Sequence, residues 1–392
     1  MVFGGYVSPG FEPVREGFER NFAEGKELGA AVAVYRGTEA LVDLWGGYRD
    51  LAATRLWERD TMVLVFSTTK GIAGFTVGVA HSHGLIDYEE RVATYWPEFA
   101  QSGKGDITVR QLLSHQAGVP AVDERLDASV LGDLDRMAAI LARQRPAWKP
   151  RDAGRLPRPE PRLVRERADP AGRSLASQHR PILPRRDRRP ARTRLPHRAS
   201  ARRAGVADRG DRRIHAVADG SAHEPHAGRH GLAYLWPRSL VARTMGNPKL
   251  HSPADINQPE YRRFEWPAGN GIGTVRSIAK AYGVFASGGH ELAIDPETLR
   301  ELEASPTPPI RGIRDVILKV DTSLSMGFMK PSRSFRFGSS ERAYGTIGAG
   351  GSFGFADPDS GVGFAYAPNR HGFHLWDDPR EKRLRDTVFA CL

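Results

Sequence analysis

The first fifty residues show two different spacings of apolar positions. Apolar residues first recur at intervals of three or four, which is the spacing of one buried helix face; these residues are Phe11, Val14, Phe18 and Phe22. Two apolar runs follow at residues 30–35 and 40–45, and the tripeptide Arg36-Gly37-Thr38 separates them. The pattern predicts a helix followed by a β-hairpin.

A serine stands where an apolar strand pattern changes into a helical one. Residues 62–66 form a short apolar run that predicts a strand leading into Ser67. Residues 69–83 have helical composition and are followed by Gly84, which suits the end of a helix. A second helix is predicted at residues 108–113, with Thr108 as its N-cap. We therefore expect Ser67 at the start of a helix.

The C-terminal part predicts a helix, a series of short strands and a terminal helix. The helix at residues 274–287 is closed by Gly288-Gly289, and the terminal helix covers residues 379–390. Short strands separated by Gly, Asp and Pro are predicted between them, at residues 326–329, 344–347, 353–355 and 363–367. This order indicates an α+β fold, in which helices pack on an antiparallel sheet.

Residues 151–213 differ in composition from the rest of the chain. They contain 20 Arg and 8 Pro, but no Lys, Asn, Phe, Tyr or Trp. With 7 acidic residues, this segment has a local charge of +13 in a chain whose net charge is +11, so all other residues together carry −2. Such a composition cannot bury enough apolar surface to offset the entropy of ordering.

Two interpretations of this Arg/Pro segment are open. One is a disordered basic insertion or nucleic-acid-binding arm, although such arms usually mix Lys with Arg. The other is a GC-rich gene read out of frame, because the codons of residues 151–163, started one nucleotide later, permit a sequence with Gly, Tyr, His, Leu and Trp. Because the shifted frame permits a sequence of the kind found in folded proteins, it favours the second interpretation. We expect residues 1–392 to form one catalytic domain of two lobes, with an anomalous segment at 151–213 that extends at most to about residue 235.

The remaining composition limits the classes of function. Because the positive charge belongs to one segment, it does not indicate a nucleic-acid partner for the whole protein. No apolar run approaches the ~20 residues of a membrane span, and the N-terminal residues lack the features of a signal peptide. We expect a cytoplasmic protein without a membrane partner. The only cysteine, Cys391, leaves no internal disulfide or cysteine-based metal site.

The tetrapeptide Ser67-Thr68-Thr69-Lys70 has the Ser-x-x-Lys pattern of a nucleophile with its base. On the first turn of a helix, positions i and i+3 share one face, so the Lys70 amine can reach the Ser67 hydroxyl. Backbone N–H groups and the helix dipole favour a developing oxyanion there and lower the pKa of the lysine. A neutral amine beside a serine is a general base. Alone the pattern is weak, since many such tetrapeptides are helix N-caps.

Further motifs accompany this tetrapeptide in a defined order. They are Gly84-Leu85-Ile86-Asp87, Leu112-Leu113-Ser114-His115-Gln116-Ala117-Gly118, Pro267-Ala268-Gly269-Asn270-Gly271 and Gly348-Ala349-Gly350-Gly351-Ser352-Phe353-Gly354. Together with Ser67 and Lys70, they resemble the class C β-lactamase-like serine hydrolases, including family VIII carboxylesterases and proteins similar to penicillin-binding proteins. The likeness covers residues 20–150 and about 236–390. An ordered set of motifs is more specific than any one of them.

The resemblance implies the serine β-lactamase fold and a two-step acyl transfer without metal or cofactor. The sheet would carry both chain ends, a mostly helical lobe would begin near Ser67, and the active site would lie between them. Thr346-Ile347-Gly348 stands where the family has its Lys-Thr-Gly strand, so Thr346 brings a hydroxyl to the substrate in place of a cation. The backbone N–H groups of Ser67 and Ala349, next to Gly348, would hold the oxyanion.

The family's proton-relay tyrosine has no counterpart in the sequence at the place where it is due. The chain has no tyrosine between Tyr95 and Tyr234. The shifted frame offers one across the codons of Leu156 and Pro157. Either the gene carries two compensating frame errors, or the protein lacks this relay.

The resulting hypothesis is a serine carboxylesterase that hydrolyses short-chain esters, small molecules, through an acyl-enzyme on Ser67. A β-lactamase or D-alanyl-D-alanine peptidase is the enzymatic alternative, but their substrates carry carboxylates, for which Thr346 offers no cation. A second alternative is an inactive relic that binds nucleic acid through residues 151–213. Acyl preference, stereoselectivity and oligomeric state are not predicted by the sequence.

Overall fold

An eight-stranded antiparallel sheet organises the part of the chain that the structure describes. The structure is a computed structural model, and it describes residues 1–148, 239–250, 253–309 and 312–392. The strand order in the sheet is β1-β3-β2-β10-β9-β8-β7-β6. The ten strands in this part are β1 Phe3–Val7, β2 Gly29–Arg36, β3 Glu39–Gly47, β4 Val63–Leu64, β5 Ile272–Gly273, β6 Leu324–Ser325, β7 Phe328–Met329, β8 Tyr344–Ile347, β9 Phe353–Asp357 and β10 Val362–Pro368.

The described helices precede, interrupt and follow these strands. They are α1 Glu12–Ala23, α2 Thr69–Ser82, α3 Val92–Tyr95, α4 Val109–Leu113, α5 Ala128–Leu131, α6 Leu134–Arg143, α9 Leu240–Met245, α10 Val275–Ala286, α11 Pro296–Glu303 and α12 Pro379–Cys391. A 3₁₀ turn, η1 Phe66–Thr68, lies directly before α2. The small strands β4 and β5 pair with each other, outside the large sheet.

Strand β2 shows why the sheet is covered on both faces. All of its residues except Arg36 are buried, and successive side chains point to opposite faces. Ala31, Ala33 and Tyr35 belong to one core cluster, whereas Ala30, Val32 and Val34 belong to another. A strand with apolar side chains on both of its faces must lie between two layers, so β2 requires helices on each side of the sheet.

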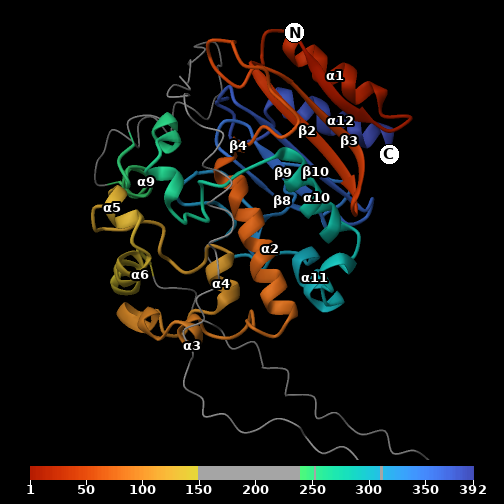
Figure 1. Cartoon of the computed structure of the whole chain (residues 1–392). Helices are drawn as coiled ribbons and strands as arrows, with labels where there is room; N and C mark the ends of the chain where they lie inside the picture. Colours follow the sequence, from red (N-terminus) through yellow and green to blue (C-terminus); the bar gives the residue numbers. More distant parts are fainter. Residues whose placement is uncertain (149–238, 251–252, 310–311) are drawn as a thin grey trace, which may run out of the picture. The chain divides into compact units, whose positions relative to one another are not determined.

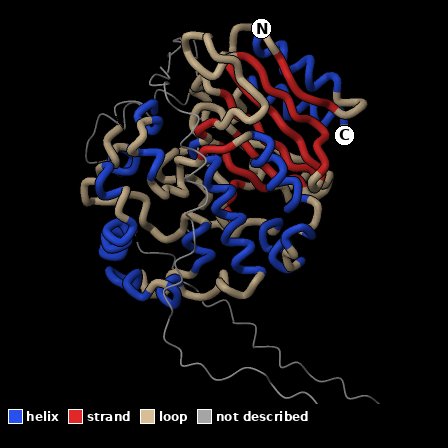
Figure 2. Tube along the Cα trace, in the orientation of Figure 1, coloured by secondary structure: helices blue, strands red, loops and turns tan. Residues whose placement is uncertain are grey.

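Different helices cover the two faces, as Figure 1 shows. Helices α1 and α12 pack against each other on one face, near both chain termini. Helix α10 packs against β2, β9 and β10 on the other face, and α2 packs there against β7 and β8. Helices α3–α6 and α9 lie further from the sheet, so helix and strand are largely separated in Figure 2. The α+β architecture with terminal helices on the sheet follows the expectation.

Most elements predicted from the pattern are present, with two corrections. The predicted strand at residues 62–66 pairs only over Val63–Leu64. The predicted strand at residues 326–329 is instead a tight hairpin, in which Met326 and Gly327 form the turn between β6 and β7. Both turn residues have positive φ, +54° and +89°, as in a type I′ hairpin turn and unlike a strand.

All described residues belong to one compact unit. The Arg/Pro segment at 151–213 lies outside the described residues, and so do the codons that offer the shifted-frame tyrosine. Among the helices of the described part, none has the length and apolar character needed to cross a membrane.

Candidate active site

Ser67 lies in the tight turn η1, between strand β4 and helix α2. The residue before it, Phe66, has φ of +45°, a left-handed conformation that is unusual for an aromatic residue. The Thr69 hydroxyl donates to the Phe66 carbonyl and accepts from the Gly271 N–H at 2.9 Å. The Gly271 carbonyl in turn accepts from Val65 N–H at 3.0 Å. These bonds, to a loop distant in sequence, hold the strained turn in place.

The Ser-x-x-Lys spacing brings its two side chains together as predicted. Lys70 Nζ lies 2.7 Å from Ser67 Oγ and 2.7 Å from the carbonyl oxygen of Ala268. Both partners are neutral, so nothing balances the loss of hydration around the amine. Burial lowers the pKa of Lys70 to about 8. Near neutral pH an appreciable fraction of Lys70 is therefore unprotonated and able to accept the Ser67 proton.

Strand β8 leads the chain to the other side of the Ser67 turn. A Cβ atom at Gly348 would lie 2.3 Å from the Val65 carbonyl oxygen and 2.2 Å from Ser352 Oγ. The strand can approach the turn this closely only because residue 348 is glycine. Ser352 Oγ donates to the Val65 carbonyl at 2.8 Å and lies 3.1 Å from Thr68 Oγ1. Ala349 is thus the residue directly after Gly348, where the chain following β8 contacts the Ser67 turn.

Thr346 plays a different part from the one expected. Its side chain is 4% exposed, and its hydroxyl donates to the Thr68 carbonyl at 3.1 Å. The same hydroxyl lies 2.9 Å from the Tyr282 hydroxyl, which must then be the donor of that second bond. The Thr346 hydroxyl is therefore used to fasten β8 to the turn, which corrects the expectation that it faces the substrate. Strand β8 offers its backbone to the site.

Two backbone amides flank this contact without a bond of their own. Within the residues that the structure describes, neither the Ser67 N–H nor the Ala349 N–H donates a hydrogen bond. Ser67 is half-buried, and backbone donors withdrawn from solvent are nearly always paired in folded proteins, whereas Ala349 is exposed. The unpaired Ser67 N–H suits the oxyanion role that the resemblance implies.

Sequence reasoning missed several neighbours of the site. The His371 ring meets the Phe66 ring edge-on at 5.4 Å, and its Nδ1 lies 3.1 Å from the Gly372 carbonyl oxygen. A carbonyl only accepts, so Nδ1 carries the proton, and burial lowers the pKa of this histidine. The contact of Lys70 with the Ala268 carbonyl was missed as well, although residues 267–271 had been identified as a motif. No local pattern could have found His371, because it reaches the site from a distant loop.

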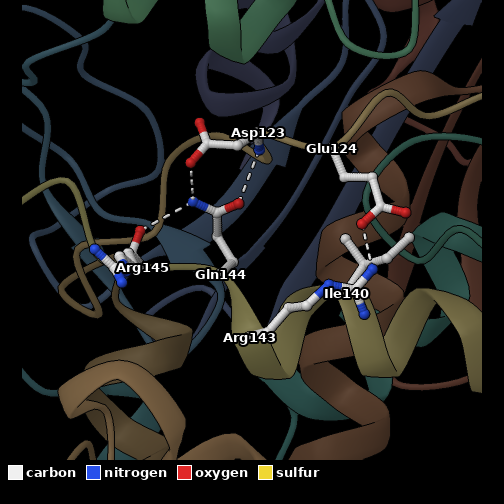
Figure 3. A pocket seen from close by; sticks show the side chains of 6 residues that line it. All are labelled: Asp123, Glu124, Ile140, Arg143, Gln144 and Arg145. Carbon is white, nitrogen blue, oxygen red and sulfur yellow. Dashed lines mark hydrogen bonds and ion pairs between the residues drawn. The ribbon is translucent and has the colours of Figure 1, made fainter.

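A pocket of about 400 Å³ lies elsewhere, at the end of α6. Figure 3 shows that its polar side chains bind one another: Arg143 pairs with Glu124, and Gln144 Nε2 donates to Asp123 Oδ2 at 2.9 Å. The described residues that line it include no serine, cysteine or histidine. In the described ranges no group of three or more His, Cys, Asp or Glu side chains is arranged to hold a metal ion. The Ser67 turn remains the candidate for chemistry.

The fold and this Ser-x-x-Lys geometry define a serine hydrolase with the fold of β-lactamases and penicillin-binding proteins. The family model described as Beta-lactamase matches residues 17–154 and 171–388. The chain therefore belongs to the beta-lactamase family, which confirms the resemblance seen in the motifs.

Individual relatives carry both esterase and β-lactamase names. The chain is 30% identical over 387 residues to Esterase/beta-lactamase LipL of Mycobacterium tuberculosis, covering 94% of this chain and 83% of that protein. It is 30% identical to a family VIII carboxylesterase of known crystal structure, with a TM-score of 0.73 and 100% of both chains covered. A penicillin-binding protein homologue from Caulobacter crescentus is 28% identical, also with a TM-score of 0.73 and full coverage of both chains.

Proposed function

We propose that this serine hydrolase is a carboxylesterase that hydrolyses short-chain esters through an acyl-enzyme on Ser67. The observation that carries the proposal is the 2.7 Å contact between Lys70 Nζ and Ser67 Oγ, together with a lysine pKa lowered to about 8. Similarity to a family VIII carboxylesterase over the full length of both chains supports the ester substrate.

The reaction proceeds in two steps that use the same base. Neutral Lys70 accepts the proton of Ser67 Oγ as this oxygen attacks the ester carbonyl carbon. The amides of Ser67 and Ala349 donate to the oxyanion of the tetrahedral intermediate. When the C–O bond of the ester breaks, the protonated Lys70 returns its proton to the leaving alcohol. Water then attacks the acyl-enzyme and Lys70 takes a proton from it. The bond from the acyl carbon to Ser67 Oγ breaks, Lys70 returns the proton to this oxygen, and the acid is released.

A β-lactamase activity is the second candidate, because the name of one relative joins both activities. The residues of β8 are Tyr344, Gly345, Thr346 and Ile347, so this strand has no cationic side chain to bind the carboxylate of a β-lactam. We therefore propose that esters are the better substrates. Comparing kcat/KM for p-nitrophenyl butyrate and for a chromogenic cephalosporin tests this order. Faster turnover of the cephalosporin would reverse it.

Labelling of the nucleophile tests the mechanism itself. A fluorophosphonate reacts with an activated serine and stays covalently attached. We expect a single labelled peptide that contains Ser67, and no labelling of the Ser67→Ala variant. The control is Ser352→Ala, which removes a hydroxyl that bonds to the Val65 carbonyl but keeps the nucleophile. Labelling at another serine in wild type would overturn the proposal.

The Arg/Pro segment at 151–213 requires its own test, since the proton-relay tyrosine is due there. We propose that the native gene encodes a folded, tyrosine-containing segment in the shifted frame. The intact mass of protein expressed from that gene decides between the frames, because replacing some 20 arginines changes the mass and the peptide map. A mass that matches the printed sequence, together with brisk esterase turnover, would contradict both the shifted frame and the need for this tyrosine.

A further inference from the structure

The glycine turn after β8 is anchored by the C-terminal segment of the chain. Gly350 and Gly351 have positive φ values of +90° and +107°. The Gly350 carbonyl accepts two hydrogen bonds, one from Gly372 N–H at 2.9 Å and one from Arg380 Nη2 at 3.1 Å. Paired glycines have more conformational freedom than other residues, so the position of this turn depends on such external contacts.

Arg380 is held so firmly that it can serve as a fixed support. It is 5% exposed, and Asp378 accepts from its Nε at 2.9 Å and from its Nη2 at 2.8 Å. Its remaining nitrogen, Nη1, donates to the Arg370 carbonyl at 2.9 Å and contacts Glu27 at 3.4 Å. A planar guanidinium bound on all sides has one orientation, and that orientation aims Nη2 at the Gly350 carbonyl.

The turn backbone lies directly on these side chains. A Cβ atom at Gly351 would lie 2.8 Å from Asp378 Oδ2, and one at Gly350 would lie 2.6 Å from the His371 ring. The turn therefore has little room to move toward the C-terminal segment. Ala349, whose amide is the second oxyanion donor of the proposed mechanism, immediately precedes Gly350.

We propose that Arg380 is a positioning residue for the oxyanion site. By fixing the Gly350 carbonyl, it holds the turn in the conformation that directs the Ala349 N–H toward the ester oxyanion. This inference rests on the proposed function, and in particular on Ala349 as a donor. Arg380 itself touches no substrate in this scheme, because its five N–H donors face the residues named above.

Three variants test the proposal: Arg380→Gln, Arg380→Lys and the control Arg383→Gln. Arg383 lies on the same helix and is also ion-paired, but its partners are Asn21 and Glu24, at the end of α1. We expect kcat to fall about 10- to 100-fold in both Arg380 variants, because a small displacement of a catalytic group costs that much. We expect KM to change less than about twofold, since ground-state binding does not use the oxyanion.

A boronic acid inhibitor provides a second readout. Its adduct with Ser67 is tetrahedral, and one boronate oxygen takes the place of the oxyanion. We expect its affinity to fall by the same factor as kcat in the Arg380 variants and to stay at the wild-type value in Arg383→Gln. A purely structural role of Arg380 would lower the melting temperature without this matched loss.

The lysine variant keeps the proposal testable if removal of the charge unfolds the protein. Arg380→Lys retains a cation for Asp378 and Glu27, so we expect it to fold. An ammonium cannot make the flat two-nitrogen contact with Asp378 and reach Gly350 at once, so kcat should stay low. Full kcat and boronate affinity in folded Arg380→Lys, or failure of this variant to fold, would overturn the inference. Absence of Ser67 labelling in wild type would instead refute the proposed function.

Discussion

Lys70 and Arg380 are two cations with little exposure to solvent, and their electrostatic environments differ. The partners of Lys70 are a hydroxyl and a carbonyl, and burial lowers its pKa to about 8. Burial also favours the neutral form of Arg380, but Tyr366, Asp378 and Glu27 reverse the effect and raise its pKa above the ordinary value. One side chain can give up its proton near neutral pH, and the other cannot.

The comparison shows that the groups in contact with a buried cation, more than its burial, decide whether its pKa falls or rises. A carboxylate in contact with the cation stabilises the charged form and makes the side chain a support. A neutral acceptor leaves the desolvation penalty uncompensated and makes the side chain a base. The hydroxyls of Thr346 and Tyr282 bond to each other beside Gly71, the residue after Lys70, whereas Glu27 and Asp378 bind Arg380.

The largest effect is expected where the base and nucleophile themselves are removed. Ser67→Ala and Lys70→Met should each lower kcat/KM for p-nitrophenyl butyrate by about 10⁴-fold or more, and by similar factors, because the two residues act as one unit. The thermal transition of Ser67→Ala should stay nearly unchanged, since the side-chain bond of Ser67 in the described residues is the one to Lys70. Lys70→Met that is labelled by a fluorophosphonate at the wild-type rate would show that the lysine is structural.

The pH dependence of activity tests whether the uncharged partners of Lys70 leave its pKa lowered. Only unprotonated Lys70 is a base, so kcat/KM should rise about tenfold per pH unit below pH 8 and level off above an apparent pKa of about 8. Lys70→Arg keeps the charge but cannot deprotonate, so it should be inactive across the whole range. A flat profile between pH 6 and pH 9, measured in wild type, would contradict this role for Lys70.

The carboxylates around Arg380 affect stability instead of activity. Burial raises the pKa of Glu27 from 4.5 to about 7, although the Arg380 charge opposes this shift. Glu27 therefore contributes stability that is fully present below pH 4.5 and is lost as the pH rises through about 7. Glu27→Gln should reduce this decline in the free energy of unfolding by about 3 kcal/mol.

Denaturant unfolding at several pH values checks the Glu27 prediction. The decline that remains in Glu27→Gln is expected from Glu381, whose pKa burial raises to about 8. Glu24→Gln is the control, because Lys26 and Arg383 lower the pKa of this exposed carboxylate in the folded protein. Glu24 is therefore ionised in folded and unfolded protein alike over the upper part of the window, where the pH approaches 7. If the free energy of unfolding depended equally on pH in wild type and in Glu27→Gln, a group other than Glu27 would cause the decline.

The smallest effect is expected at Thr346. Thr346→Val keeps the shape of the side chain but leaves the Tyr282 hydroxyl and the Thr68 carbonyl without this partner. The free energy of unfolding should fall by about 1 to 3 kcal/mol, while Thr346→Ser, which retains the hydroxyl, should lose less. If Thr346 touched the substrate, Thr346→Val would instead raise KM with unchanged stability.

Local pattern was sufficient for most elements and for the contact between Ser67 and Lys70. The recurrence of Phe11, Val14, Phe18 and Phe22 corresponds to the buried face of α1. The interval of three between Ser67 and Lys70 is bridged on a single turn, so the 2.7 Å contact could be predicted without knowledge of the rest of the fold. The turn at Met326 and Gly327 was mistaken for strand, because apolar residues on both sides hid a change of backbone conformation.

The sequence by itself therefore determined the family and the contact between Ser67 and Lys70, since these depend on short-range geometry and on an ordered set of motifs. Only the tertiary structure decided the inward direction of Thr346, the Ala268 carbonyl on Lys70 and the support of Gly350 by Arg380. Each of these depends on which distant backbone segments meet. Burial and pairing, and with them the pKa values of Lys70 and Arg380, arise only when those segments come together.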